Sequence, residues 1–166
     1  HDLPDAIEAI LHADVVVLGP GSLYTSIIPN LLIPGFVDAL ARTSALRIYV
    51  CNVMTQPGET DGYTASDHLK AILTHSGSQQ ILDYVVVNRA RITSAQTKKY
   101  AKEAAYPVQP DVGALEKLGV KVHMRDLLDQ RDLVRHASAK LAAEIMLLAG
   151  SHDRHKTNGR NGDRVG

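Results

Sequence analysis

The sequence contains little cysteine and few aromatic residues. Its 166 residues include a single cysteine, Cys51, which excludes an intramolecular disulfide and any zinc site built from paired cysteines. Aromatic residues make up 4% of the chain and tryptophan does not occur, so Val, Ile, Leu and Ala must form the core. Because disulfides mark oxidising compartments, this composition favours a reducing one, and we expect a cytoplasmic protein.

The sequence also lacks an excess of charge of either sign. Lys and Arg together number 18, as do Asp and Glu, so no overall field favours nucleic acid or an anionic membrane as a partner. No apolar run approaches the roughly 20 residues of a membrane span, and no signal peptide is visible. The chain begins at His1 inside a helical pattern, and we expect it to be a piece of a longer protein.

Short apolar runs alternate with helical patterns over residues 1–150. Strands are predicted at 14–18, 46–51, 81–87 and 120–124, and helices at 5–12, 35–43, 64–76, 93–104, 111–118 and 132–149. Continuous apolar runs are typical of strands that are covered on both faces of a parallel sheet. The pattern therefore predicts an α/β fold, a three-layer Rossmann-like domain with a mainly parallel sheet. From Ser151 onward the composition becomes polar, which predicts a disordered tail over 151–166.

Local signals mark the ends of the helix at 64–76. Thr64 followed by Asp67 resembles a capping box, and Gly77 is suited to the position that ends a helix. Between the first two strands, Pro29 and Pro34 are predicted to interrupt the chain.

A segment rich in glycine and hydroxyl groups, Gly19-Pro-Gly-Ser-Leu-Tyr-Thr-Ser26, directly follows the first strand. Ligands of open α/β sheets bind at the carboxyl ends of strands, and a helix N-terminus offers N–H groups to an anion. The candidate contacts to phosphate or sugar oxygens are Gly19, Gly21, Ser22, Thr25 and Ser26. The alternative is a tight turn in which Ser22 caps the next helix. The segment is not a Walker A loop. Ser22 also lies in no GxSxG elbow, which weakens a hydrolase interpretation.

A second polar segment, 52–61, directly follows the second strand. Asn52, Thr55 and Gln56 carry directional hydrogen-bonding groups suited to a nucleobase or a sugar. Glu59 and Asp61 could hold a metal ion or sugar hydroxyls. The alternative is a solvated Pro-Gly turn.

Two further candidates are Tyr100 and Arg135. Tyr100 lies among lysines, where its ring could stack on a base or a sugar. Arg135 is predicted in the first turn of the last helix, where the macrodipole disfavours a cation unless a bound anion compensates. The alternatives are a half-buried packing role for Tyr100 and a surface ion pair with Asp129 or Asp132 for Arg135.

These segments resemble the gluconeogenesis factor (YvcK) family of the CofD-like superfamily. The resemblance is carried by Ala13-Asp-Val-Val-Val-Leu-Gly-Pro-Gly-Ser-Leu-Tyr-Thr-Ser-Ile-Ile-Pro-Asn30 and by Tyr49-Val-Cys-Asn-Val-Met-Thr-Gln-Pro-Gly-Glu-Thr-Asp-Gly-Tyr-Thr-Ala-Ser-Asp-His68. A shorter match is Asp132-Leu-Val-Arg-His136. The resemblance implies that residues 1–150 are the C-terminal half of a CofD-like domain. The family's glycine-rich loop after its first strand would lie upstream of His1.

The resemblance implies a regulatory factor that binds UDP-N-acetylglucosamine and is required for cell shape and for growth on gluconeogenic carbon sources. It implies Tyr100 and Arg135 as contacts to the UDP-sugar, no required cofactor, and protein partners in cell-wall regulation. No enzymatic reaction is firmly attached to this branch, so a non-catalytic factor is expected. The resemblance is also compatible with a homo-oligomer.

Two rival functions remain open. A CofD-like phosphotransferase of the 2-phospho-L-lactate transferase type would need Mg²⁺ to bridge phosphates, and Glu59, Asp61 and Asp67 are the nearby carboxylates. Alternatively, the protein is a scaffold on which partners dock, with the nucleotide stabilising its fold.

Overall fold

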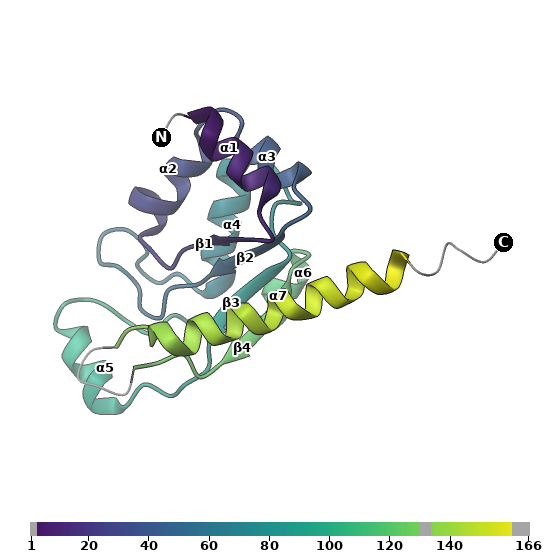
Figure 1. Cartoon of the computed structure of the whole chain (residues 1–166). Helices are drawn as coiled ribbons and strands as arrows, with labels where there is room; N and C mark the ends of the chain where they lie inside the picture. The colour runs from purple at the N-terminus through teal and green to yellow at the C-terminus, as the bar shows by residue number, and fades with distance from the viewer. Residues whose placement is uncertain (1–2, 130–133, 161–166) are drawn as a thin grey trace.

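The sheet of the protein is parallel throughout the part of the chain that the structure describes. The computed structural model describes residues 3–129 and 134–160. Its four strands are β1 (Val15–Leu18), β2 (Leu46–Val50), β3 (Tyr84–Asn88) and β4 (Lys121–Arg125). They pair in the order β1-β2-β3-β4, each parallel to the next (Figure 1). The predicted mainly parallel α/β sheet is confirmed, and all four carboxyl ends lie at one edge.

Helices cover both faces of this sheet. They are α1 (Leu3–His12), the π-helical turn η1 (Leu23–Ile27), α2 (Ile28–Leu31), α3 (Phe36–Arg42), α4 (Ala65–Ser76), α5 (Ser94–Ala101), α6 (Val112–Lys117) and α7 (Ser138–Arg160). α7 crosses one face, and η1, α2, α3, α4 and α6 pack on the other (Figure 1). α5 instead packs through Tyr100 against Val53, beyond the end of β2. The predicted three-layer arrangement is therefore confirmed.

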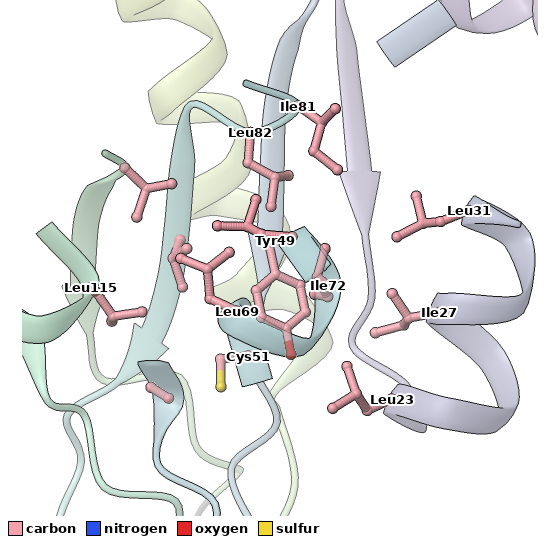
Figure 2. Close-up of a cluster of buried hydrophobic side chains, with 14 of the residues drawn as sticks. Leu23, Ile27, Leu31, Tyr49, Cys51, Leu69, Ile72, Ile81, Leu82 and Leu115 are labelled. Atoms are coloured by element: carbon pink, nitrogen blue, oxygen red, sulfur yellow. The ribbon is translucent and has the colours of Figure 1, made fainter. Parts of the chain in front are cut away.

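The alternation of side chains along β2 divides the core into two clusters. Tyr49 and Cys51 point to the face covered by η1, α4 and α6, where Leu69 and Ile72 pack around the Tyr49 ring (Figure 2). Ile48 points to the opposite face, where it packs with Leu141 of α7. Because successive side chains of a strand point to opposite faces, β2 is apolar on both of them, and its single charged residue, Arg47, pairs with Asp83.

The ends of α4 follow the signals in the sequence. The Thr64 side chain accepts a hydrogen bond from the Asp67 N–H, and the Asp67 carboxylate accepts one from the Thr64 N–H. Gly77 ends the helix in the left-handed conformation, with φ of 65°. The predicted capping box and terminating glycine are both confirmed.

The last helix differs from its predicted range at both ends. It begins at Ser138, because His136 instead forms an antiparallel bridge with Leu128. The predicted start at Asp132 lies outside the described residues. At the other end α7 continues through 151–160, which the composition places in a disordered tail. Propagating an existing helix adds one hydrogen bond for each residue fixed, so a polar extension is possible. Residues 161–166 lie outside the described part.

The segment between β1 and β2 also differs from expectation. Pro29 lies inside the short helix α2, at one of its first two positions, where the missing N–H of proline is tolerated. Among the described helices, no single one is long and apolar enough to cross a membrane. Two segments pass this test only together, Leu23–Leu31 (η1 with α2) and α3, and they are bent by 74° relative to each other.

Candidate functional site

A hollow lies where the carboxyl ends of β1 and β2 meet the segment that precedes α7. Its volume is about 260 Å³. It is lined by Gly21, Ser22, Asn52, Val53, Met54, Gln56, Val134, Arg135 and His136. Five of the residues selected from the sequence therefore lie around one hollow: Gly21, Ser22, Asn52, Gln56 and Arg135.

Asn52 joins the two loops. Its side-chain N–H donates to the Gly21 carbonyl at 2.9 Å, and its side-chain oxygen accepts from the Gly21 N–H at 3.2 Å. Both ends of the amide are thus used within the protein. Asn52 shapes the wall of the hollow by fixing the backbone of the first loop.

Glu59 holds the start of η1. Its Oε1 atom accepts a hydrogen bond from the Ser22 hydroxyl at 2.6 Å and another from the Tyr24 N–H at 3.1 Å. The Thr25 hydroxyl in turn donates to the Ser22 hydroxyl. Of these two hydroxyls, both expected to face a phosphate, that of Ser22 therefore points to a carboxylate and that of Thr25 points to Ser22. An anion at the same place would meet the negative charge of Glu59.

Glycine is required at position 19 because the backbone there has a positive φ and lies close to the end of β2. Its φ is +80°, and a Cβ atom there would lie 2.9 Å from the Val50 carbonyl oxygen. Gly19 and Ser26 line a separate hollow of about 270 Å³ along β1, and Thr25 is exposed to solvent. The structure therefore does not bring Gly19, Thr25 or Ser26 into the hollow beside Arg135.

Thr55 and Tyr100 form hydrogen bonds that hold the segments around the hollow in place. Thr55 is 4% exposed and exchanges two hydrogen bonds with the backbone of Tyr106, at 2.7 and 2.9 Å. The Tyr100 hydroxyl accepts a hydrogen bond from the Val134 N–H at 2.9 Å, and its ring packs against the cluster that contains Val53. Tyr100 thus holds the segment that carries Arg135 and His136, and neither supporting residue lines the hollow.

Arg135 lies before the last helix, next to the bridge residue His136. The interpretation based on the macrodipole is therefore wrong, because the bridge between Leu128 and His136 delays the helix to Ser138. The Arg135 side chain is 59% exposed, and its Nε lies 3.7 Å from Oδ2 of Asp129. This confirms an ion pair with Asp129, but a long and solvated one.

His136 was not selected from the sequence, although it lies beside Arg135 in the Asp-Leu-Val-Arg-His match. Its Nε2 atom is buried at the hollow and has no hydrogen-bond partner among the described residues. Burial lowers the pKa of His136, while a hydrogen bond from its ring to the Cys51 backbone carbonyl acts in the opposite direction. The sequence feature that points to His136 is its position directly after Arg135, a candidate cation.

A second hollow adjoins the first. Its volume is about 450 Å³, and Arg135 and His136 border both. The other residues that line it are Pro20, Ser138, Leu141, Ala142 and Ile145. The two residues therefore separate a polar hollow from a largely apolar one.

The carboxylates proposed as metal ligands have different partners. Asp61 accepts a hydrogen bond from the Gly58 N–H at 2.8 Å, and Asp67 caps α4. Within residues 3–129 and 134–160, no three His, Cys, Asp or Glu side chains gather in a way that could hold a metal ion.

Comparison with known proteins adds a family context. The sequence pattern of the 2-phospho-L-lactate transferase CofD family matches residues 1–128. A gluconeogenesis factor from Halalkalibacterium halodurans is 49% identical over 145 residues, and one from Bacillus subtilis is 42% identical over 145 residues. In both cases the match covers 87% of this chain and 45% of the relative, so the chain spans about half the length of these relatives.

A solved structure extends this comparison to the fold. The crystal structure of a UPF0052 family member from Bacillus halodurans matches with a TM-score of 0.83 at 48% identity. The match covers 87% of this chain and 46% of that one. The α/β architecture is therefore shared with this relative.

Proposed function

Because the chain belongs to the CofD family and matches gluconeogenesis factors over 87% of its length, we propose that it binds UDP-N-acetylglucosamine within a regulatory gluconeogenesis factor. This factor would be required for cell shape and for growth on gluconeogenic carbon sources. Its cytoplasmic location, its protein partners in cell-wall regulation and its oligomeric state belong to the same proposal.

The observation that carries the proposal is the position of Arg135 in the lining of the polar hollow. Its ion pair with Asp129 spans 3.7 Å and is largely exposed, so it contributes little to stability. The guanidinium can therefore exchange this partner for a diphosphate, which it would bind through charge-assisted hydrogen bonds. Phosphate recognition rests on Arg135 here, since Glu59 already accepts from Ser22 and Tyr24.

The dimensions of the site favour an elongated ligand. The polar hollow, at about 260 Å³, is slightly smaller than the usual range of ligand pockets, about 300–1,000 Å³. The adjoining hollow continues past Arg135 and His136. A diphosphate at Arg135 would thus have room on either side, with Val53, Met54 and Val134 offering apolar surface to a base or a sugar ring.

The test is calorimetric titration of the full-length parent protein with UDP-N-acetylglucosamine. Arg135→Ala should lower the affinity roughly 10- to 100-fold, as loss of a hydrogen bond to a charged group does. Arg42→Ala, which removes an exposed cation of α3, is the matched control and should bind like the wild type. Equal affinity in the two variants would remove Arg135 from the site.

The match to the CofD family supports a second candidate, a phosphotransferase that acts on a nucleotide-linked donor. Under this alternative Mg²⁺ would bridge the phosphates. The same titration with Mg²⁺ separates the two functions, because intact ligand after incubation supports the regulatory factor and turnover supports the transferase.

A further inference from the structure

Two buried polar atoms at the hollow lack a partner in the described part of the chain. They are Oε1 of Gln56 and Nε2 of His136. Both residues line the same hollow, together with Arg135. A buried polar group without a hydrogen bond costs about 1–3 kcal/mol, so two at one site point to groups that meet a ligand.

The hydrogen bond to Cys51 defines what His136 can offer. The Cys51 carbonyl accepts from the imidazole, and Nε2 is the nitrogen without a partner, so the proton of the neutral ring lies on Nδ1. Nε2 is then a hydrogen-bond acceptor. Because burial lowers the pKa of the ring, this neutral form is favoured.

Gln56 is held in place by its backbone. Its N–H donates to the Thr60 hydroxyl at 2.9 Å, and its carbonyl accepts from the N–H groups of Glu59 and Thr60. The side-chain amide takes no part in this turn. Its oxygen is therefore a second unpartnered acceptor, buried in the wall of the hollow.

We infer that Gln56 and His136 are ligand-recognition residues, whose Oε1 and Nε2 atoms accept hydrogen bonds from O–H or N–H groups of the ligand bound at Arg135. This inference rests on the proposed function and specifies it. The site combines a cation with two acceptors, so it selects an anion that carries hydrogen-bond donors. Pyrophosphate has the charge that Arg135 requires but offers no sugar hydroxyl or base N–H to the two acceptors.

The donors could come from either end of a nucleotide sugar. The sugar offers hydroxyl groups and an acetamido N–H, and uracil offers its imide N–H. Titrations with UDP-N-acetylglucosamine and with UDP distinguish these sources. A variant that weakens both ligands equally places the donor on the uridine part, whereas one that weakens only the nucleotide sugar places it on the sugar.

The experiment uses the full-length parent protein, Gln56→Leu and His136→Phe. We expect each variant to bind UDP-N-acetylglucosamine about tenfold more weakly than the wild type, the effect of one lost hydrogen bond. Gln56→Leu should leave the Tm of the ligand-free protein unchanged or raise it, because it replaces an unpartnered oxygen with an apolar group of similar size. Gln79→Leu, at an exposed position, is the matched control.

The outcomes separate this inference from the proposed function. His136→Phe also removes the hydrogen bond to Cys51 and can destabilise the fold, so Gln56→Leu decides the question. Wild-type binding with no loss in Gln56→Leu would overturn the inference and leave the proposed function standing. Failure of the wild type to bind would overturn both.

Discussion

Asn52 and Gly21 exchange two hydrogen bonds, at 2.9 and 3.2 Å, across the carboxyl ends of β1 and β2. This contact joins two loops that are 31 residues apart in the sequence. It places the backbone of the first loop and Gln56 of the second at the same hollow. The amide of Asn52 thus acts as a fixed connection within the protein.

Asn52→Ala should therefore weaken both fold and binding. The substitution leaves the N–H and the carbonyl of Gly21 without their partners, which should lower the free energy of unfolding by about 1–3 kcal/mol. Urea denaturation of the chain measures this change. Asn30→Ala, which removes one hydrogen bond to Ser26 on an exposed surface, is the control and should cost less. Equal losses in the two variants would contradict the role of Asn52.

Glu59 should oppose an anion near Ser22 while it stabilises the loop. Glu59→Gln keeps an oxygen that can accept from Ser22 and Tyr24 but removes the negative charge. We expect this variant of the full-length parent to bind UDP several-fold more tightly, with a free energy of unfolding within about 1 kcal/mol of the wild type. Glu59→Ala should be less stable, because both donors lose their acceptor. Weaker binding by Glu59→Gln would show that the carboxylate itself contacts the ligand.

Acid should destabilise the connection between Arg47 and Asp83. The Asp83 carboxylate accepts from the Arg47 backbone N–H, Nε and Nη2 at 2.7–3.0 Å. Burial alone would raise the pKa of Asp83, but the hydrogen bonds and charge of Arg47 together lower it. A carboxylate whose pKa is lower in the folded state stabilises the fold above its unfolded pKa of about 3.9 and loses this contribution as the pH falls further.

Asp83→Asn provides the corresponding measurement. The variant should be less stable at pH 7, and its free energy of unfolding should fall less steeply than that of the wild type below about pH 4. Asp38→Asn, which removes an exposed carboxylate from the start of α3, is the matched control. If Asp83→Asn and the wild type show parallel curves in acid, the pair with Arg47 does not carry the acid sensitivity.

The sheet was predictable from the sequence because its signals are local. The apolar runs at 14–18 and 46–51 and the caps at Thr64 and Gly77 each depend on neighbouring residues alone. The position of Arg135 was not predictable in this way. It depends on the bridge between Leu128 and His136, a contact between segments that sequence periodicity does not connect.

The candidate site shows the same division. Its location follows from the rule that ligands bind at the carboxyl ends of parallel strands, which selected Gly21, Asn52 and Gln56 correctly as neighbours. The partners of individual polar atoms could not be predicted, because Ser22 and Glu59 are 37 residues apart. Whether a side chain faces a ligand or another residue is decided by such tertiary contacts.

Tyr100 provides a test of support against direct contact. Tyr100→Phe keeps the ring that packs near Val53 but removes the oxygen that accepts from the Val134 N–H. We expect the free energy of unfolding to fall by about 1 kcal/mol, the usual value of one hydrogen bond, and the affinity of the full-length parent for UDP-N-acetylglucosamine to fall by only a few-fold. Because Tyr100 acts through the segment that carries Arg135, its loss should add little to Arg135→Ala in the double variant. Independent, additive losses of affinity would instead show that Tyr100 contacts the nucleotide sugar itself.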